Sequence, residues 1–251
     1  MKRKIIISPD YKHLKEYIEA IPRDFDHLGT LIHDGRNQIR VVKAGGQTIN
    51  IKKYGRPRFI NRYIYSLYLR KPKGYRAFVY PSLLKERGID SPDSIAYIED
   101  RKMGIITDSY YISIHGKSNV NLYDMGHDKE GQMDDTAVAL ARFTADVHEA
   151  GVMHLDYSPG NMLCLKDEEG GHHFSLIDTN RMYFGKVGIK KGCSNFARIW
   201  ATKKTVCKMA RVYAAQRGYD PGECERLVLK YRRLFWKKFI LKHKPGYDVE
   251  L

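Results

Sequence analysis

The stretch from His154 to Asp178, HLDYSPGNMLCLKDEEGGHHFSLID, decides how the rest of the chain is interpreted. Asp156 near its start is followed five residues later by the amide Asn161. Two short apolar runs come next, at 162–166 and 172–178, and the DEEGG segment that joins them predicts a β-hairpin with a glycine-containing turn. Because the second run ends on Asp178, the hairpin should carry Asn161 and Asp178 to the same rim.

This spacing is typical of phosphoryl transfer from ATP, for which a protein must position a hydroxyl group and neutralise charge on the phosphates. Asp156 is predicted to accept the hydroxyl proton, and His154 to brace the loop. Asn161 and Asp178 carry the oxygen ligands that Mg²⁺ prefers, so both are predicted metal ligands. Each residue alone could serve only a turn or a cap. Their common register, with a helix before them and a hairpin between them, favours a kinase.

At these residues the sequence resembles the lipopolysaccharide core kinase family of Gram-negative bacteria, which phosphorylates Kdo or heptose sugars, and most closely its Bacteroides-type members. The resemblance extends from about Arg36 to about Trp200. The stretches that carry it are INIKKYG, LLKERGIDSPDSIAYIED, HLDYSPGNML, FSLIDTNRMYFG and SNFARIW. Aminoglycoside kinases share the catalytic loop, so IDTNRM in place of Asp-Phe-Gly is the more discriminating motif. The resemblance implies a lipid-anchored glycan acceptor at the inner membrane.

The N-terminal part of the chain is rich in predicted strands. GTLIH, QIRVVK and TINIKKY are separated by two turns and predict three antiparallel strands. Gly35 lies in the first turn, where it either lets backbone N–H groups approach phosphates or serves an ordinary hairpin. Lys52 matches the strand lysine of kinases, which pairs with the α- and β-phosphates. Lys53 should point to the opposite face of the sheet.

The helix predicted between Lys73 and Arg87 departs from the kinase pattern. Val79 stands where the wider family's pattern places the glutamate that pairs with the strand lysine. Pro81 should kink or restart the helix. Glu86 would lie on the same helix face as Val79 only if the helix were continuous. The sequence therefore leaves the partner of Lys52 open.

Composition points to anionic partners. The chain has 251 residues, 44 Lys or Arg against 29 Asp or Glu, and a net charge of +15, which favours nucleic acid, phospholipid headgroups or phosphorylated sugars. The segment from Lys52 to Arg76 holds nine Lys or Arg, six Tyr or Phe and no acid. It predicts either a helix with a solvated basic face, a membrane-docking surface, or a site for nucleic acid. The basic residues chosen for docking are Arg58, Arg62, Arg70 and Lys71.

Other features are less specific. The four cysteines have neither zinc-type nor CxxC spacing, so reduced thiols are expected. MKRKIIISPD is too short for a signal segment or a membrane span, which predicts a cytoplasmic protein.

Ser158 replaces the lysine of protein kinases and no Ala-Pro-Glu follows Asp178, so a protein substrate is not expected. Arg181 either contacts substrate or pairs within its loop.

The last predicted helix places an apolar face against a basic one, an arrangement that either lies on a membrane or is simply solvated. The apolar face comprises Leu227, Tyr231, Leu234, Phe235 and Phe239, and the basic face Lys230, Arg232, Arg233, Lys237 and Lys238.

Together these features predict an α+β, protein-kinase-like fold in one domain of two lobes, covering residues 1–251. A β-rich N-lobe should reach about residue 111, a hinge about 112–118 should contact adenine, and a mostly helical C-lobe should follow. The favoured function is an ATP- and Mg²⁺-dependent sugar kinase. We expect it to work at an anionic membrane surface and not to bind nucleic acid. The sequence leaves its oligomeric state open. The alternatives are a catalytically weak kinase-fold binding protein, suggested by the missing glutamate, and a basic nucleic-acid-binding module.

Overall fold

The computed structural model describes residues 2–55 and 71–250, which form two compact units. The first unit comprises residues 1–86, 91–116 and 178–180, and the second comprises residues 87–90, 117–177 and 181–251. Asp178 therefore belongs with the first unit, although the hairpin that precedes it belongs to the second.

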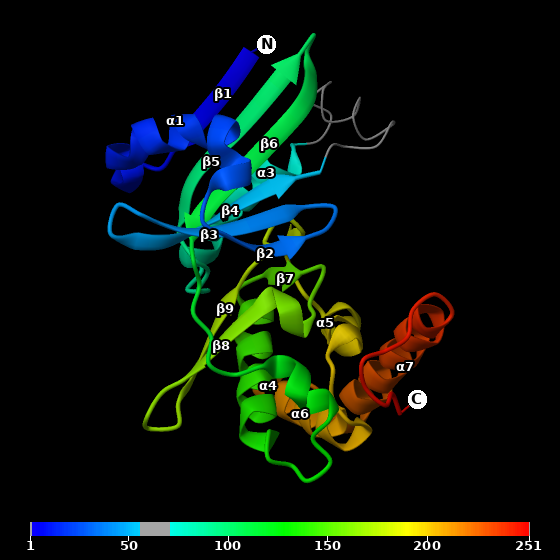
Figure 1. Cartoon of the computed structure of the whole chain (residues 1–251). Helices are drawn as coiled ribbons and strands as arrows, with labels where there is room; N and C mark the ends of the chain where they lie inside the picture. Colours follow the sequence, from blue (N-terminus) through cyan, green and yellow to red (C-terminus); the bar gives the residue numbers. More distant parts are fainter. Residues whose placement is uncertain (1, 56–70, 251) are drawn as a thin grey trace. The chain divides into compact units, whose positions relative to one another are not determined.

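The first unit is built on one antiparallel sheet with the strand order β1-β5-β6-β4-β3-β2 (Figure 1). The three strands predicted after Gly29 are confirmed, and β5 and β6 extend the same sheet. The N-terminal segment is an edge strand. The bounds are β1 Lys2–Ile7, β2 Thr30–Asp34, β3 Gln38–Ala44, β4 Gln47–Tyr54, β5 Ser94–Lys102 and β6 Ile105–Ile114.

One face of this sheet is apolar and forms the core of the first unit. Alternation along β4 directs Ile49 and Ile51 to this face. Helix α1 (Lys15–Asp24) and the 3₁₀ turns η1 (Pro9–Leu14) and η2 (Phe25–His27) cover it (Figure 1). Ile18 of α1 is fully buried against these strands. Burial of such side chains contributes roughly 1.5–3 kcal/mol each, so this face supplies much of the stability of the unit.

The other face of the sheet is polar and aromatic. Lys52 pairs across strands with Tyr111, and Tyr111 pairs with Tyr97, so the three form one row. Helix α3 (Lys73–Lys85) packs over this row through Gly74. A Cβ atom at Gly74 would lie 2.7 Å from Cε2 of Tyr97 and 3.2 Å from Cε2 of Tyr54. Glycine is needed here because the helix backbone approaches the tyrosine rings closely.

Helix α3 is not restarted at Pro81, which corrects one of the two outcomes predicted for this proline. It runs without interruption from Lys73 to Lys85 with Pro81 inside. Proline costs about 3 kcal/mol in a helix interior because it lacks an N–H donor and clashes with the preceding turn. Ala77, Pro81 and Leu84 are all buried and recur at i, i+4 and i+7, so packing of one apolar face offsets this cost.

The second unit is mostly helical, with two small two-stranded sheets. The hairpin predicted after Asn161 is confirmed as β8 paired with β9. The remaining bounds are η3 Leu122–Gly126, α4 Asp134–Glu149, β7 Val152–His154, η4 Pro159–Asn161, β8 Met162–Lys166, β9 His172–Leu176, β10 Met182–Phe184, α5 Ile189–Asn195, η5 Phe196–Arg198, α6 Lys203–Arg217 and α7 Pro221–Ile240. A strand-rich first unit and a helical second unit confirm the predicted α+β class.

Arg232 on α7 corrects the predicted basic face of the last helix. Its side chain is 1% exposed and does not join the surface lysines. It donates to the carbonyl oxygens of Ile199 and Ala201 at 2.9 and 2.6 Å and to the hydroxyl of Tyr247 at 2.8 Å. Helical periodicity cannot distinguish a solvated arginine from one that satisfies buried carbonyl groups, which explains the wrong placement.

Two further observations concern the whole described chain. Within residues 2–55 and 71–250, none of the helices combines the length and apolar character needed to span a bilayer. The four cysteines are free thiols, and Cys164, Cys193 and Cys224 are buried.

Candidate active site

The loop that carries Asp156 follows the short pairing of β7 with β10. Met182 pairs with His154, and the backbone N–H of Leu155 donates to the carbonyl of Arg181 at 2.8 Å. Asn161 closes the loop, because its Nδ2 donates to the carbonyl of Asp156 at 2.7 Å. This bond uses the nitrogen of the amide and leaves its Oδ1 as an oxygen ligand. Asp156 and Asn161 are thus brought together as the spacing predicts.

His154 is fully buried beneath this loop and has a defined tautomer. The backbone N–H of Asp156 donates to its Nδ1 at 3.0 Å, so the proton of a neutral ring lies on Nε2. Nε2 in turn lies 3.0 Å from the carbonyl oxygen of Ile177, the residue before Asp178. The imidazole therefore ties the Asp156 backbone to the end of the β8–β9 hairpin.

Two arginines converge on the carboxylate of Asp156. Arg181 Nη1 donates to Oδ2 at 2.9 Å, and Arg198 Nη1 donates to Oδ1. Arg181 was considered from the sequence because it follows Asp178 closely, whereas Arg198 lies 42 residues from Asp156 in the chain and was missed. The SNFARIW motif contained it, but only the folded chain shows that its guanidinium reaches the loop.

The segment that presents Arg198 is anchored to the same loop by a buried polar network. Asn195, at the end of α5, donates from Nδ2 to the carbonyl of His154 at 2.9 Å. Its Oδ1 lies 3.0 Å from Nε2 of His148 on α4, and Nδ1 of His148 lies 2.9 Å from the hydroxyl of Tyr213. Burial lowers the pKa of His148 from 6.5 to about 4, so the ring is neutral near pH 7.

The lowered pKa of His148 predicts that the protein loses stability in mild acid. Below pH 6.5 the unfolded chain takes up a proton at this ring, whereas the folded chain does so only near pH 4. The free energy of unfolding should therefore fall by up to about 3 kcal/mol between these pH values. Urea unfolding at several pH values measures this. His148→Gln should remove that part of the pH dependence, while the matched control at the exposed His173, His173→Gln, should keep it.

The first unit holds a separate pair of candidate residues, Lys52 and Asp178. Lys52 Nζ lies 2.7 Å from Asp178 Oδ1, and the two side chains are 15% and 29% exposed. Asp178 has φ +52°, a left-handed conformation that is uncommon for residues other than glycine. Asn180, two residues on, also donates to Asp178 Oδ1.

The two neighbouring lysines of β4 face opposite sides of the sheet, as alternation predicts. Lys53 Nζ lies 5.0 Å from the ring centroid of Phe25, in the apolar core beneath α1. Lys52 Nζ lies 5.3 Å from the ring centroid of Tyr54 on the other face. Only Lys52 therefore shares a face with Asp178.

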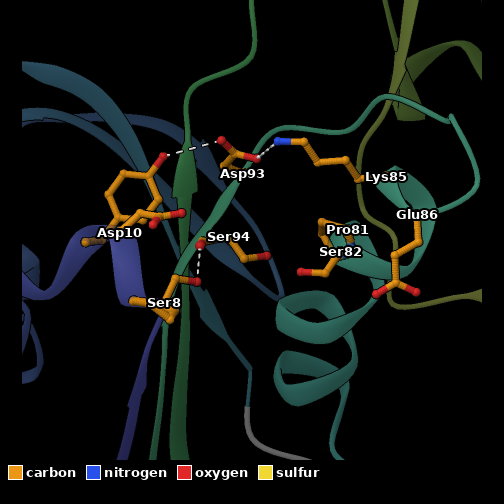
Figure 2. Close-up of a pocket in the computed structure, with 10 residues that line it drawn as sticks. Ser8, Asp10, Pro81, Ser82, Lys85, Glu86, Asp93 and Ser94 are labelled. Carbon is orange, nitrogen blue, oxygen red and sulfur yellow. Dashed lines mark hydrogen bonds and ion pairs between the residues drawn. The ribbon is translucent and has the colours of Figure 1, made fainter.

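The partner of Lys52 that the sequence left open is Asp178. Glu86 is the exposed C-cap residue of α3. It lines a hollow of about 430 Å³ whose opposite wall is formed by Ser8–Tyr11, Asp93 and Ser94. Figure 2 shows this hollow, with Lys85 beside Asp93 and Ser8 bonded to the Ser94 carbonyl. Neither Lys52 nor Asp178 lines it.

This geometry predicts that Glu86 is dispensable for turnover. Replacing Glu86 with glutamine should change kcat and the KM for ATP by less than about twofold, because exposed groups outside a binding site contribute little. Steady-state kinetics measures this. A loss comparable to that of Lys52→Ala would instead identify Glu86 as the functional partner of the lysine.

Gly35 lies in the β2–β3 turn, where its N–H donates to the carbonyl of Asn37 at 3.2 Å. Its φ is not positive, since it is absent from the residues with left-handed backbones. A Cβ atom at this position would lie 3.0 Å from Nε2 of His33, so the turn leaves little room for a side chain here. A hollow of about 300 Å³ adjoins it, lined also by Arg36, Gln38, Lys53, Tyr54, Gly55 and Asp108.

Most of the predicted docking segment lies outside the described residues. This applies to Arg58, Arg62 and Arg70. Lys71 is described and exposed, and its Nζ lies 5.4 Å from the ring centroid of Tyr75.

These features define a class of protein, a kinase-like phosphotransferase with an aspartate and asparagine on one loop and a paired lysine and aspartate beside a sheet. Residues 33–200 match the lipopolysaccharide kinase (Kdo/WaaP) family. The chain therefore belongs to this family and is a phosphotransferase that acts on a sugar hydroxyl with ATP as the donor. No curated protein sequence matches it.

A solved structure supports the fold. The chain is similar to WaaP in a complex with acyl carrier protein, with 17% identity and a TM-score of 0.63 over 93% of this chain and 98% of that chain. This likeness confirms the predicted kinase-like fold. The bifunctional kinase-methyltransferase WbdD is also similar, with 14% identity and a TM-score of 0.46 over 79% of this chain and 43% of that chain.

Proposed function

We propose that this protein phosphorylates a hydroxyl group of Kdo or heptose in the lipopolysaccharide inner core, using ATP and Mg²⁺. The observation that carries the proposal is the loop on which Asn161 holds the Asp156 backbone, because it combines a proton acceptor with an oxygen ligand for a metal. Membership of the lipopolysaccharide kinase family supplies the substrate class.

The proposal assigns a role to each site residue. Asp156 orients the acceptor hydroxyl and takes its proton, and His154 holds the loop. As the hydroxyl oxygen bonds to the γ-phosphorus, the bond from that phosphorus to the β,γ-bridging oxygen breaks and ADP leaves. Lys52 pairs with the α- and β-phosphates, and Gly35 lets the turn approach them. We further propose that the two units are the lobes of one domain, with a hinge at about 112–118.

The two residues proposed as metal ligands, Asn161 and Asp178, carry the oxygen donors that Mg²⁺ prefers. In the described residues no three His, Cys, Asp or Glu side chains are gathered closely enough to hold a metal by themselves. Asn161 Oδ1 and the Asp178 carboxylate are hard oxygen ligands, and magnesium commonly combines one or two such ligands with substrate phosphates. Bound there, the ion would neutralise charge on the transferring phosphoryl group. Magnesium should therefore bind strongly only together with ATP.

The C-terminal end of α7 supports a role at an anionic membrane. Leu234, Ile240 and Leu241 are 58%, 44% and 83% exposed there. They are interspersed with the exposed basic residues Lys230, Arg233, Lys237, Lys238 and Lys242. Exposed apolar side chains among lysines suit insertion between lipid headgroups, where each basic residue contributes about 1 kcal/mol.

A membrane role can be tested by separating binding from catalysis. Replacing Ile240, Leu241 and Lys242 with glutamine should weaken binding to anionic liposomes and activity on a lipid-anchored acceptor. Activity on a short soluble acceptor should stay near wild type. A matched set in the first unit, the exposed Ile32, Met103 and Lys102 replaced with glutamine, should have little effect. Equal loss on both acceptors would assign the α7 end to folding or catalysis instead.

The proposed function is tested most directly by mass spectrometry of lipid A-core from cells with and without the protein. One fewer phosphate per core is expected in its absence, and an unchanged phosphate count would reject the substrate. A thermal shift with ATP but no change in the core would favour the alternative, a binding protein of kinase fold.

A further inference from the structure

The carboxylate of Asp156 carries one negative charge but contacts two guanidinium groups. Arg181 and Arg198 each donate to a different oxygen of it. One guanidinium would be enough to orient a carboxylate, and it could do so by a bidentate contact. Instead each arginine uses one Nη1, which leaves further N–H groups on both for another acceptor. The loop therefore presents a net positive charge beside the group that receives the hydroxyl proton.

Both arginines are held in place by the fold. The backbone of Arg181 is fixed by the bond from Leu155, next to Asp156. The Arg198 guanidinium lies 5.1 Å from the ring centroid of Phe235 on α7. The chain immediately after Arg198 is fixed by Arg232, which donates to the carbonyls of Ile199 and Ala201. A pre-organised arginine loses little entropy when it binds an anion.

The two side chains are also accessible. Arg181 is 50% exposed and Arg198 is 40% exposed, whereas the Asp156 side chain is 20% exposed. A ligand whose hydroxyl reaches Asp156 would thus meet both guanidinium groups on its way. Because both groups touch the Asp156 carboxylate itself, an anion bound by them lies within a few ångströms of the reacting hydroxyl.

We infer that Arg181 and Arg198 form an anion-binding subsite for the acceptor, and that the acceptor is a sugar acid phosphorylated on the ring that carries its carboxylate. The short separation favours an anionic group on the same ring over a phosphate on a neighbouring unit. Guanidinium groups match the planar carboxylate. This inference rests on the proposed function and refines it, because it favours Kdo, which is an acid, over a neutral heptose.

The test compares two acceptors with two kinds of variant. The acceptors are a soluble Kdo-containing saccharide without phosphate and the same saccharide with its carboxylate converted to a carboxamide. A hydrogen bond to a charged group contributes about 1.5–3 kcal/mol, so the wild type should prefer the acid in kcat/KM by about 10- to 100-fold. In Arg181→Gln and Arg198→Gln this preference should fall towards one, with the affinity for ATP unchanged.

A matched control removes a positive charge that does not touch Asp156. Lys191 of α5 is exposed, and its Nζ lies 3.5 Å from the ring centroid of Tyr183. Lys191→Gln should retain the preference for the acid. If the arginine variants turn over too slowly, calorimetry should show that each binds the acid and the carboxamide equally, while the wild type binds the acid more tightly.

The outcomes separate this inference from the proposed function. Equal activity of the wild type on acid and carboxamide, or a preference that survives both arginine changes, would overturn the inference while leaving a sugar kinase. A further pair of acceptors, heptose with and without a phosphate on a neighbouring sugar, tests whether the two arginines bind that phosphate instead of a carboxylate. An arginine-dependent preference for the phosphorylated heptose would overturn the assignment to a sugar acid. Tight ATP binding without turnover of any acceptor would overturn the proposed function itself.

Discussion

Replacing Asp178 with alanine is expected to abolish turnover and to weaken the binding of ATP in the presence of magnesium. Its carboxylate is the proposed charged ligand of the metal and the observed partner of Lys52. The change therefore removes one group that neutralises the triphosphate and leaves the lysine without its carboxylate. Loss of electrostatic stabilisation at a transferring phosphoryl group costs at least about 10³-fold in kcat. The affinity for ATP should fall by at least about tenfold.

The measurement is a titration of ATP with and without magnesium, followed by thermal shift or calorimetry, beside steady-state kinetics. Asp26→Ala is a suitable control, because Asp26 is an exposed aspartate of the same unit. It should leave both quantities unchanged. The magnesium dependence of ATP binding should disappear in Asp178→Ala and persist in the control. Retention of magnesium-dependent binding by Asp178→Ala would show that the metal is held elsewhere.

The features that the sequence predicted well are local. Alternation along TINIKKY separates Lys52 from Lys53 because successive side chains in a strand point to opposite faces. The closure of the loop from Asp156 to Asn161 is equally local, since the hydrogen bond that closes it joins residues only five positions apart. Both could be predicted without knowing how distant segments pack.

The features that the sequence did not predict depend on distant segments. Asp178 pairs with Lys52 across 126 residues, whereas Glu86 was the nearest candidate along the chain. Arg198 reaches Asp156 in the folded chain, where Asn195 and Arg232 anchor the backbone on either side of Arg198. A restart of the helix at Pro81 was one expectation because propensity is a local quantity, but α3 continues through Pro81 with its apolar face buried.

Replacing Asp156 with asparagine is expected to abolish turnover as well, but to leave the affinity for ATP nearly intact. Positioning of the hydroxyl and acceptance of its proton act in the transition state and not in the binding of ATP. General-base help is commonly worth about 10²–10⁴-fold, and the two arginines that contact this carboxylate would lose a charged partner. Asparagine is preferred to alanine because it keeps an oxygen beside them.

The comparison of the two aspartate variants tests the division of roles. The affinity for ATP should stay within about threefold of the wild-type value in Asp156→Asn. It should fall by at least about tenfold in Asp178→Ala, although both variants lose turnover. Thermal unfolding of the free proteins controls for misfolding. The proposed role of Asp156 is to take the proton of the acceptor hydroxyl and not to bind ATP. ATP should therefore still raise the melting temperature of Asp156→Asn by mass action. An equal loss of ATP binding in the two variants would refute the assignment of Asp156 to the acceptor and Asp178 to the metal.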